Sequence, residues 1–113
     1  MAMINDHCGI ERDARGVVTL TIRNAGPLNI VSSPIMRAVR AGLDGLAPDD
    51  SIRAVVMRGT GEKSLIGGAD IKEMARLDPA SAETFITALS DLCEAARRFP
   101  APVIARIPGW CLG

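Results

Sequence analysis

Aromatic residues are scarce in this sequence, and neither sign of charge is in excess. Phe85, Phe99 and Trp110 are its only aromatic side chains, and 13 basic residues balance 13 acidic ones. Proteins that bind nucleic acid usually carry a basic face, and those that bind single strands stack the bases on aromatic rings. We therefore expect no nucleic-acid partner. A hydrophobic content of 48% without net charge indicates a folded domain with an aliphatic core.

Cysteines are few, and long apolar runs are missing. Cys8, Cys93 and Cys111 are odd in number and widely spaced, so neither a disulfide framework nor a zinc site is expected. No stretch approaches the roughly 20 apolar residues that span a membrane. The segment Met1–Arg15 lacks the apolar run of a signal peptide. These absences favour a cytoplasmic protein with reduced thiols, no metal and no membrane partner.

The segments that are present predict an α/β chain. A hairpin of two strands comes first, and strands then alternate with helices, which favours a mainly parallel sheet with right-handed crossovers. The expected strands are Cys8–Arg12, Val17–Arg23, Ile52–Arg58 and Pro102–Ile107. The expected helices begin after a cap at Ser32 or Ser33, at about Ala69 with an end near Leu77, and after a cap at Asp78 with an end before Pro100.

Two of these helices carry apolar residues at helical spacing and should bury one face each. The stripe of the first helix consists of Ile35, Val39, Leu43 and Leu46. The stripe of the third helix consists of Phe85, Ile86, Leu89, Leu92, Cys93 and Ala96.

The loop 59–64 contains the residue types of a phosphate-binding loop but not their order. Such a loop needs Gly-Lys-Ser or Gly-Lys-Thr at its end. Here Glu62 separates Gly61 from Lys63 and brings a carboxylate to the place where phosphate oxygens would lie. We therefore interpret the loop as a solvated turn and do not expect nucleotide binding.

The paired glycines before the second helix are the most informative feature. Gly67 and Gly68 permit backbone angles that other residues avoid and allow another molecule to approach the main chain. Free N–H groups at the start of a helix point toward that space. The N–H of Ala69 could therefore donate to a carbonyl oxygen that gains negative charge. The alternative is a plain tight turn, with Asp70 as an acid that suits the helix dipole.

Other candidate groups have weaker support. Glu62 and Glu73 could form a catalytic acid pair, but Glu73 is expected on the exposed face of its helix beside Lys72. His7 lies near a loose terminus without an acid partner, so no catalytic role is expected for it. Packing in the core is expected for three sulfur-containing side chains, Met36, Met74 and Cys111.

Two segments, in order and at matching separation, resemble the enoyl-CoA hydratase/isomerase (crotonase) family. Residues 63–74, Lys-Ser-Leu-Ile-Gly-Gly-Ala-Asp-Ile-Lys-Glu-Met, resemble the family segment that ends in Ala-Gly-Ala-Asp-Ile-Lys-Glu-Met. Residues 102–113, Pro-Val-Ile-Ala-Arg-Ile-Pro-Gly-Trp-Cys-Leu-Gly, resemble a second signature with a strand, an Asn-Gly turn and a run of glycines. The resemblance covers about residues 10–113.

The sequence departs from the family pattern at four places. Leu65 stands where the family usually has Phe, Gly67 where it has Ala or Ser, and Pro108 where it has Asn. The loop Asn24–Ile30 is shorter than is typical. These changes concern packing and loop shape, and they leave the substrate preference open.

The resemblance implies a crotonase-like (ClpP/crotonase) spiral of strand–helix units, of which residues 1–113 would be the N-terminal part, truncated at Gly113. It implies an acyl-CoA thioester substrate whose carbonyl oxygen binds two main-chain N–H groups, with Ala69 as the first donor. The implied substrate-binding residues are Gly67, Gly68, Ala69, Asp70, Ile71 and Lys72. It implies no cofactor beyond the CoA of the substrate and a homo-oligomer, a trimer or a hexamer.

The second donor matches the position directly after Gly113, and no acid in this sequence matches the two glutamates of typical hydratases. One missing donor of this kind raises a barrier by about 2.7–4 kcal/mol, and a missing acid–base group slows a reaction by roughly 100- to 10,000-fold. We expect the 113 residues alone to be inactive or nearly so. Three readings stay open: an enoyl-CoA hydratase, a crotonase-type isomerase, and a non-catalytic CoA-binding or assembly module.

Overall fold

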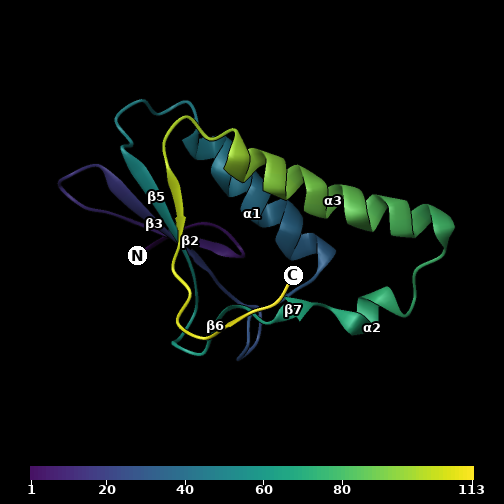
Figure 1. Cartoon of the computed structure of the whole chain (residues 1–113). Helices are drawn as coiled ribbons and strands as arrows, with labels where there is room; N and C mark the ends of the chain where they lie inside the picture. Colours follow the sequence, from purple (N-terminus) through teal and green to yellow (C-terminus); the bar gives the residue numbers. More distant parts are fainter.

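The main sheet has five strands in the order β1-β2-β3-β5-β8, and two helices pack together on one of its faces (Figure 1). The computed structural model describes residues 1–113. The sheet strands are β1 Ala2–Asn5, β2 Cys8–Arg12, β3 Val17–Ile22, β5 Ala54–Gly59 and β8 Val103–Ala105. Two small parallel pairs lie outside this sheet, β4 Ile30–Val31 with β7 Gly68–Ala69, and β6 Ser64–Ile66 with β9 Trp110–Cys111. The helices are α1 Ser33–Leu46, α2 Ile71–Met74 and α3 Pro79–Arg97.

The predicted layout is confirmed for the hairpin and for the parallel strands. Strands β2 and β3 are antiparallel and joined by a turn in which Gly16 has a φ of +83°. Strand β3 is parallel to β5, and β5 is parallel to β8. The strands predicted at Ile52–Arg58 and Pro102–Ile107 are shorter in the structure than in the prediction. Pro102 has no main-chain N–H and cannot donate to a ladder, which fits the start of β8 at Val103.

The core lies between β3, β5 and α1. Alternate residues of β3 point into it, and the predicted stripe of α1 meets them from the other side. The core residues of these three elements are Val18, Leu20, Ile22, Val55, Ile35, Met36, Val39, Leu43 and Leu46. Aliphatic side chains therefore supply the burial that stabilises the domain, as the composition predicts.

Several sequence predictions of burial are wrong. On α3, Phe85 is buried, but Ile86 is 56% exposed and Cys93 is exposed, so only part of the predicted stripe faces α1. Met74 and Cys111 are also exposed rather than in the core. Helical spacing fixes which residues share a face but not how much of that face a neighbour covers.

The N-terminus is more ordered than predicted. Residues Ala2–Asn5 form β1 and pair antiparallel with β2. The ring nitrogen Nδ1 of His7 lies 2.9 Å from the carbonyl oxygen of Arg23. The expectation of a loose terminus around His7 is therefore wrong, because the turn Asp6–His7 returns the chain along β2.

No helix is both long and apolar enough to cross a membrane. The cytoplasmic location and the trimeric or hexameric assembly stay predictions.

Phe85 and Ile86 are neighbours on α3 with opposite burial, and they form a matched pair for a stability test. Phe85→Ala should lower the free energy of unfolding by about 3–5 kcal/mol because it empties a core site. Ile86→Ala should change it by less than about 0.5 kcal/mol because the side chain is mostly exposed. Urea denaturation measures both values. Equal losses in the two variants would contradict the observed orientation of α3.

Asp49 links the end of α1 to β2 and should make stability depend on acid. Hydrogen bonds from Ser51, and then one from Arg12 to Oδ2 at 2.6 Å, lower the pKa of Asp49 to about 2. Because the pKa is lowered on folding, this contribution is present above about pH 4 and is lost as the pH falls toward 2. The carboxyl resonance of Asp49 should titrate near pH 2 by NMR, and Arg12→Gln should raise that midpoint. A midpoint near 4 in the unaltered chain would contradict the contact.

Candidate functional site

The predicted site begins where β7 pairs with β4. The N–H of Gly67 donates to the carbonyl oxygen of Asn29 at 3.1 Å, and the N–H of Asp70 donates to that of Val31 at 3.0 Å. Neighbouring N–H groups of an extended strand point to opposite sides. Since the Asp70 N–H faces β4, the N–H of Ala69 points away from β4 and stays outside this pairing.

The two glycines are required for different reasons. At Gly67 a side chain would collide with the carbonyl oxygen of Leu28, so the close approach of two main chains excludes a Cβ. At Gly68 the φ of +120° lies in a region that L-residues rarely adopt. Strands β4 and β7 pair in parallel register, Ile30 opposite Gly68 and Val31 opposite Ala69, and in this register the N–H of Asp70 rather than that of Ala69 faces β4.

A cavity of about 490 Å³ lies beside the β4–β7 pair. Its size falls in the range of about 300–1,000 Å³ that is typical of small-molecule sites. Its lining residues are Ala25, Gly26, Ile30, Gly67, Ala69, Asp70, Ile71 and Lys72. Five of the six residues predicted to bind substrate therefore share one cavity. Gly68 is the exception, because the position of its missing Cβ faces Leu112 at 3.8 Å instead.

The helix predicted from Ala69 to Leu77 is wrong at both ends. Ala69 closes β7, and α2 is a single turn with no buried residue. Asp70 is its N-cap and accepts from the N–H groups of Lys72 at 2.9 Å and Glu73 at 3.3 Å. The carboxylate of Asp70 is thus occupied by capping, which agrees in part with the plain structural interpretation. Lys72 forms no ion pair, so its ammonium group is free to meet an anion.

Glu73 does not lie on the exposed face of its helix, in contrast to the prediction. Its carboxylate accepts from the main-chain N–H of Ser33 at 2.8 Å and from the hydroxyl of the same residue. Glu62 lies in the β5–β6 loop and pairs with arginines there. The two glutamates have separate partners and do not form an acid pair.

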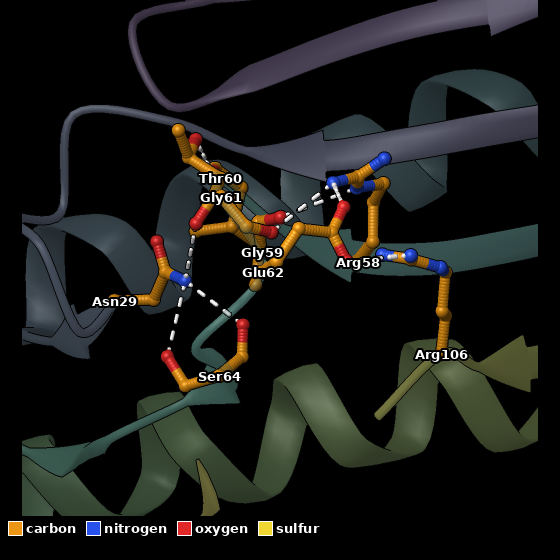
Figure 2. A network of polar contacts seen from close by, with 9 residues as sticks. Asn29, Arg58, Gly59, Thr60, Gly61, Glu62, Ser64 and Arg106 are labelled. Atoms are coloured by element: carbon orange, nitrogen blue, oxygen red, sulfur yellow. Dashed lines mark hydrogen bonds and ion pairs between the residues drawn. The ribbon is translucent and has the colours of Figure 1, made fainter. Parts of the chain in front are cut away.

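Figure 2 shows how the β5–β6 loop is held in front of β6. The amide nitrogen Nδ2 of Asn29 donates to the carbonyl oxygens of Thr60 and Ser64, both at 3.1 Å. Glu62 pairs with Arg106 at 2.7 Å and Arg58 at 3.0 Å, and hydrogen bonding to Arg106 lowers the pKa of Glu62. Salt bridges at the exposed surface add little stability, so the buried amide is the main tie of this loop.

Sequence reasoning missed Asn29 as a supporting residue. It is fully buried and has a φ of +55°, a conformation in which Asn is enriched among non-glycine residues. At Gly59 a side chain would collide with its amide group, which explains that glycine as well. An asparagine between Pro27 and a strand was the available signal, but it does not reveal which carbonyl groups lie opposite.

The C-terminal segment runs along the other edge of β6. Trp110 donates its N–H to the carbonyl oxygen of Lys63 at 2.9 Å, and Leu112 donates to that of Ile66 at 3.0 Å. Figure 1 shows the end of the chain beside β7. The two segments that carry the sequence resemblance are therefore neighbours in space, and their junction lies next to Ala69.

Comparison with known proteins agrees with this arrangement. Residues 12–113 match the family model described as enoyl-CoA hydratase/isomerase. The chain belongs to the enoyl-CoA hydratase/isomerase family. A probable enoyl-CoA hydratase of Mycobacterium avium is 32% identical over 118 residues, which cover 100% of this chain and 45% of that protein. The mitochondrial methylglutaconyl-CoA hydratase of Mus musculus is 28% identical over 104 residues, which cover 92% of this chain and 33% of that protein.

Solved structures confirm the predicted crotonase-like α/β fold. The crystal structure of an enoyl-CoA hydratase from Mycobacterium smegmatis superimposes with a TM-score of 0.82 at 38% identity, over 91% of this chain and 40% of that one. Pseudomonas aeruginosa DspI gives a TM-score of 0.87 at 29% identity, over 96% and 41% of the two chains. This chain thus spans between a third and a half of the length of these relatives.

The close approach at Gly67 can be tested against a glycine that has free space. Gly67→Ala should destabilise the chain by about 1–3 kcal/mol, because the methyl group must push β7 away from the loop before β4. Gly45 lies in α1 with nothing near its absent Cβ, so Gly45→Ala should stabilise it by about 0.5–1 kcal/mol. Thermal or urea unfolding measures both changes. A neutral Gly67→Ala variant would show that the two main chains can separate freely.

Proposed function

We propose that this chain is part of an enoyl-CoA hydratase-like enzyme, binds its acyl-CoA thioester substrate and supplies one of the two N–H donors to the thioester oxygen. The observation that carries the proposal is the Ala69 main-chain N–H, which lies at a cavity and outside the β4–β7 pairing. The family match and the names of the hydratase relatives support this type of substrate.

Ala69 suits the donor role for a physical reason. Negative charge accumulates on the thioester oxygen when hydroxide adds to the acyl group, and also when a base removes a proton from it. A fixed N–H stabilises that charge without reorganisation. The pairing of β7 with β4 and the hydrogen bond from the Asp70 N–H to Val31 hold the Ala69 N–H in a fixed direction before a ligand arrives. The methyl side chain of Ala69 leaves room for an acyl group in the cavity.

The other cavity residues divide into a polar and an apolar side. Ile30 and Ile71 offer apolar surface, and Ile71 is 77% exposed in the ligand-free chain. Lys72 carries a free positive charge next to them, and CoA carries several phosphate groups. We propose that the thioester end lies at Ala69 and that the ammonium group of Lys72 attracts a phosphate of CoA.

The complete reaction needs groups that this chain does not contain. The second donor is proposed at the position directly after Gly113, beside Ala69, and the acid–base groups in a part of the domain outside residues 1–113. Hydration of a 2-enoyl-CoA is the proposed reaction of the whole protein. The alternative that the same cavity also supports is a CoA-binding module without catalysis, because binding needs only the groups present here.

Titration of the chain with acetoacetyl-CoA, free CoA and ATP tests the binding proposal. Acetoacetyl-CoA should shift the amide resonances of Ala69 and Lys72 by NMR and bind more tightly than free CoA, which lacks the thioester oxygen. ATP has phosphates but no pantetheine arm and should bind more weakly than either. If all three ligands bound equally well, the attraction of Lys72 for their phosphates would explain the binding, and the proposal would be overturned.

Ala69→Pro removes the proposed donor, because proline has no main-chain N–H. It should reduce the preference for acetoacetyl-CoA over free CoA by roughly two- to tenfold, in keeping with about 0.5–1.5 kcal/mol for a hydrogen bond to the neutral thioester oxygen of the bound ligand. Ala69→Gly keeps the N–H and serves as the matched control. Loss of preference in both variants, or in neither, would argue against the N–H of residue 69 as the donor.

A further inference from the structure

Helix α1 begins without a cap of its own. Its N-cap residue Ser32 forms no side-chain capping bond, Pro34 follows in the first turn, and that turn contains no acidic residue. The first N–H groups of a helix have no partner inside the helix, and they carry the positive end of its dipole. Ser33 is buried, so water is a poor substitute for a partner there.

Glu73 provides this cap from a different part of the chain. It is 40 residues away in sequence, yet one carboxylate oxygen accepts from the Ser33 N–H at 2.8 Å and the other accepts from the Ser33 hydroxyl. Hydrogen bonds to a charged acceptor are stronger than neutral ones. The negative charge also lies at the favourable end of the α1 dipole.

Short α2 depends on this contact for its position. It has a single turn and no buried residue, so no apolar side chain anchors it. Two polar ties remain. Asp70 donates its N–H to the carbonyl oxygen of Val31, and Glu73 binds Ser33. Val31 and Ser33 lie two residues apart at the junction of β4 and α1.

These contacts close a ring next to the proposed donor. The ring runs from Val31 to the N–H of Asp70, through the capping bond between the Asp70 carboxylate and the Glu73 N–H, and from the Glu73 carboxylate back to Ser33. The Ala69 N–H belongs to the preceding peptide, one Cα away from the Asp70 N–H. A displacement of α2 would pull on Asp70 and change the backbone angles of Ala69, which set the direction of the Ala69 N–H.

We infer that Glu73 is a positioning residue, which fixes the direction of the Ala69 N–H by clamping α2 to the start of α1. Glu73 does not line the cavity. Its effect on binding rests on the proposed function, whereas its effect on the Ala69 peptide does not. This positioning role differs from a purely stabilising one. If the contact between Glu73 and Ser33 only added stability, its loss would leave the direction of the Ala69 N–H unchanged.

Three variants test the clamp in the full 113-residue chain. Glu73→Ala removes both acceptor oxygens. Glu73→Gln keeps an oxygen for the Ser33 N–H but loses the charge. Glu83→Ala is the control, because Glu83 is exposed on α3 and forms no hydrogen bond or ion pair. NMR of the ligand-free chain measures the amide resonances and the hydrogen exchange of Ser33 and Ala69.

Glu73→Ala should shift both resonances and speed exchange of the Ser33 amide roughly tenfold or more, whereas Glu83→Ala should leave them unchanged. Glu73→Gln should fall between the two. The preference for acetoacetyl-CoA over free CoA should drop in Glu73→Ala by at most the roughly two- to tenfold expected for Ala69→Pro, because misdirecting the N–H cannot cost more than removing it, and Glu73→Gln should restore part of it.

The outcomes separate the two proposals. If Glu73→Ala lowers the unfolding midpoint but leaves the Ala69 resonance and the ligand preference as they were, the clamp is only a stabilising contact and the inference is wrong. If the unaltered chain shows no preference for acetoacetyl-CoA, the proposed function fails. In that case a shifted Ala69 resonance in Glu73→Ala, with recovery in Glu73→Gln, still supports the clamp, and an unshifted one overturns it.

Discussion

The hydrogen bond from the Asp70 N–H to the carbonyl oxygen of Val31 is the constraint on which the site depends. Because the N–H of Asp70 donates to β4, the adjacent N–H of Ala69 points away from β4. Had Ala69 donated to β4, the strand would have continued as a regular ladder and would have offered the cavity no donor. The glycine before Ala69 belongs to this arrangement, because Gly68 has a φ of +120°, which an L-residue would rarely adopt.

The folding of the domain and the shape of the site share the same few segments. Strand β4 passes without a loop into α1, whose apolar face fills the core, and β7 passes directly into α2, which borders the cavity. A rigid core thus fixes one side of the β4–β7 pair. On the other side Ala69 packs against that core, and the remaining ties of β7 and α2 are polar contacts, which are directional and break over short distances. Precision at the site therefore comes from hydrogen bonds, while stability comes from aliphatic packing.

Much of the fold follows from local sequence signals. Alternation in Val17–Ile22, the stripe of α1 and the Asp78 cap of α3 each require only nearby residues, and the structure contains all three. The cavity residues could be predicted because Gly67 and Gly68 stand directly before a predicted helix start, where free N–H groups gather, and because the segment resembles a known family. Contacts between segments that are distant in the sequence could not be predicted. Nothing near Glu73 indicates that Ser33 lacks a cap, and an exposed position next to Lys72 was the natural expectation.

The buried amide of Asn29 restricts what can occupy that position. Its Nδ2 group meets two carbonyl oxygens, from Thr60 and Ser64, and the Ser64 hydroxyl, while its own Oδ1 has no hydrogen-bond partner in the chain. Aspartate has the same shape but would direct a negative charge at those oxygens, and leucine would leave them without a donor. Deamidation of this one side chain would therefore convert the tie of the β5–β6 loop into a repulsive contact.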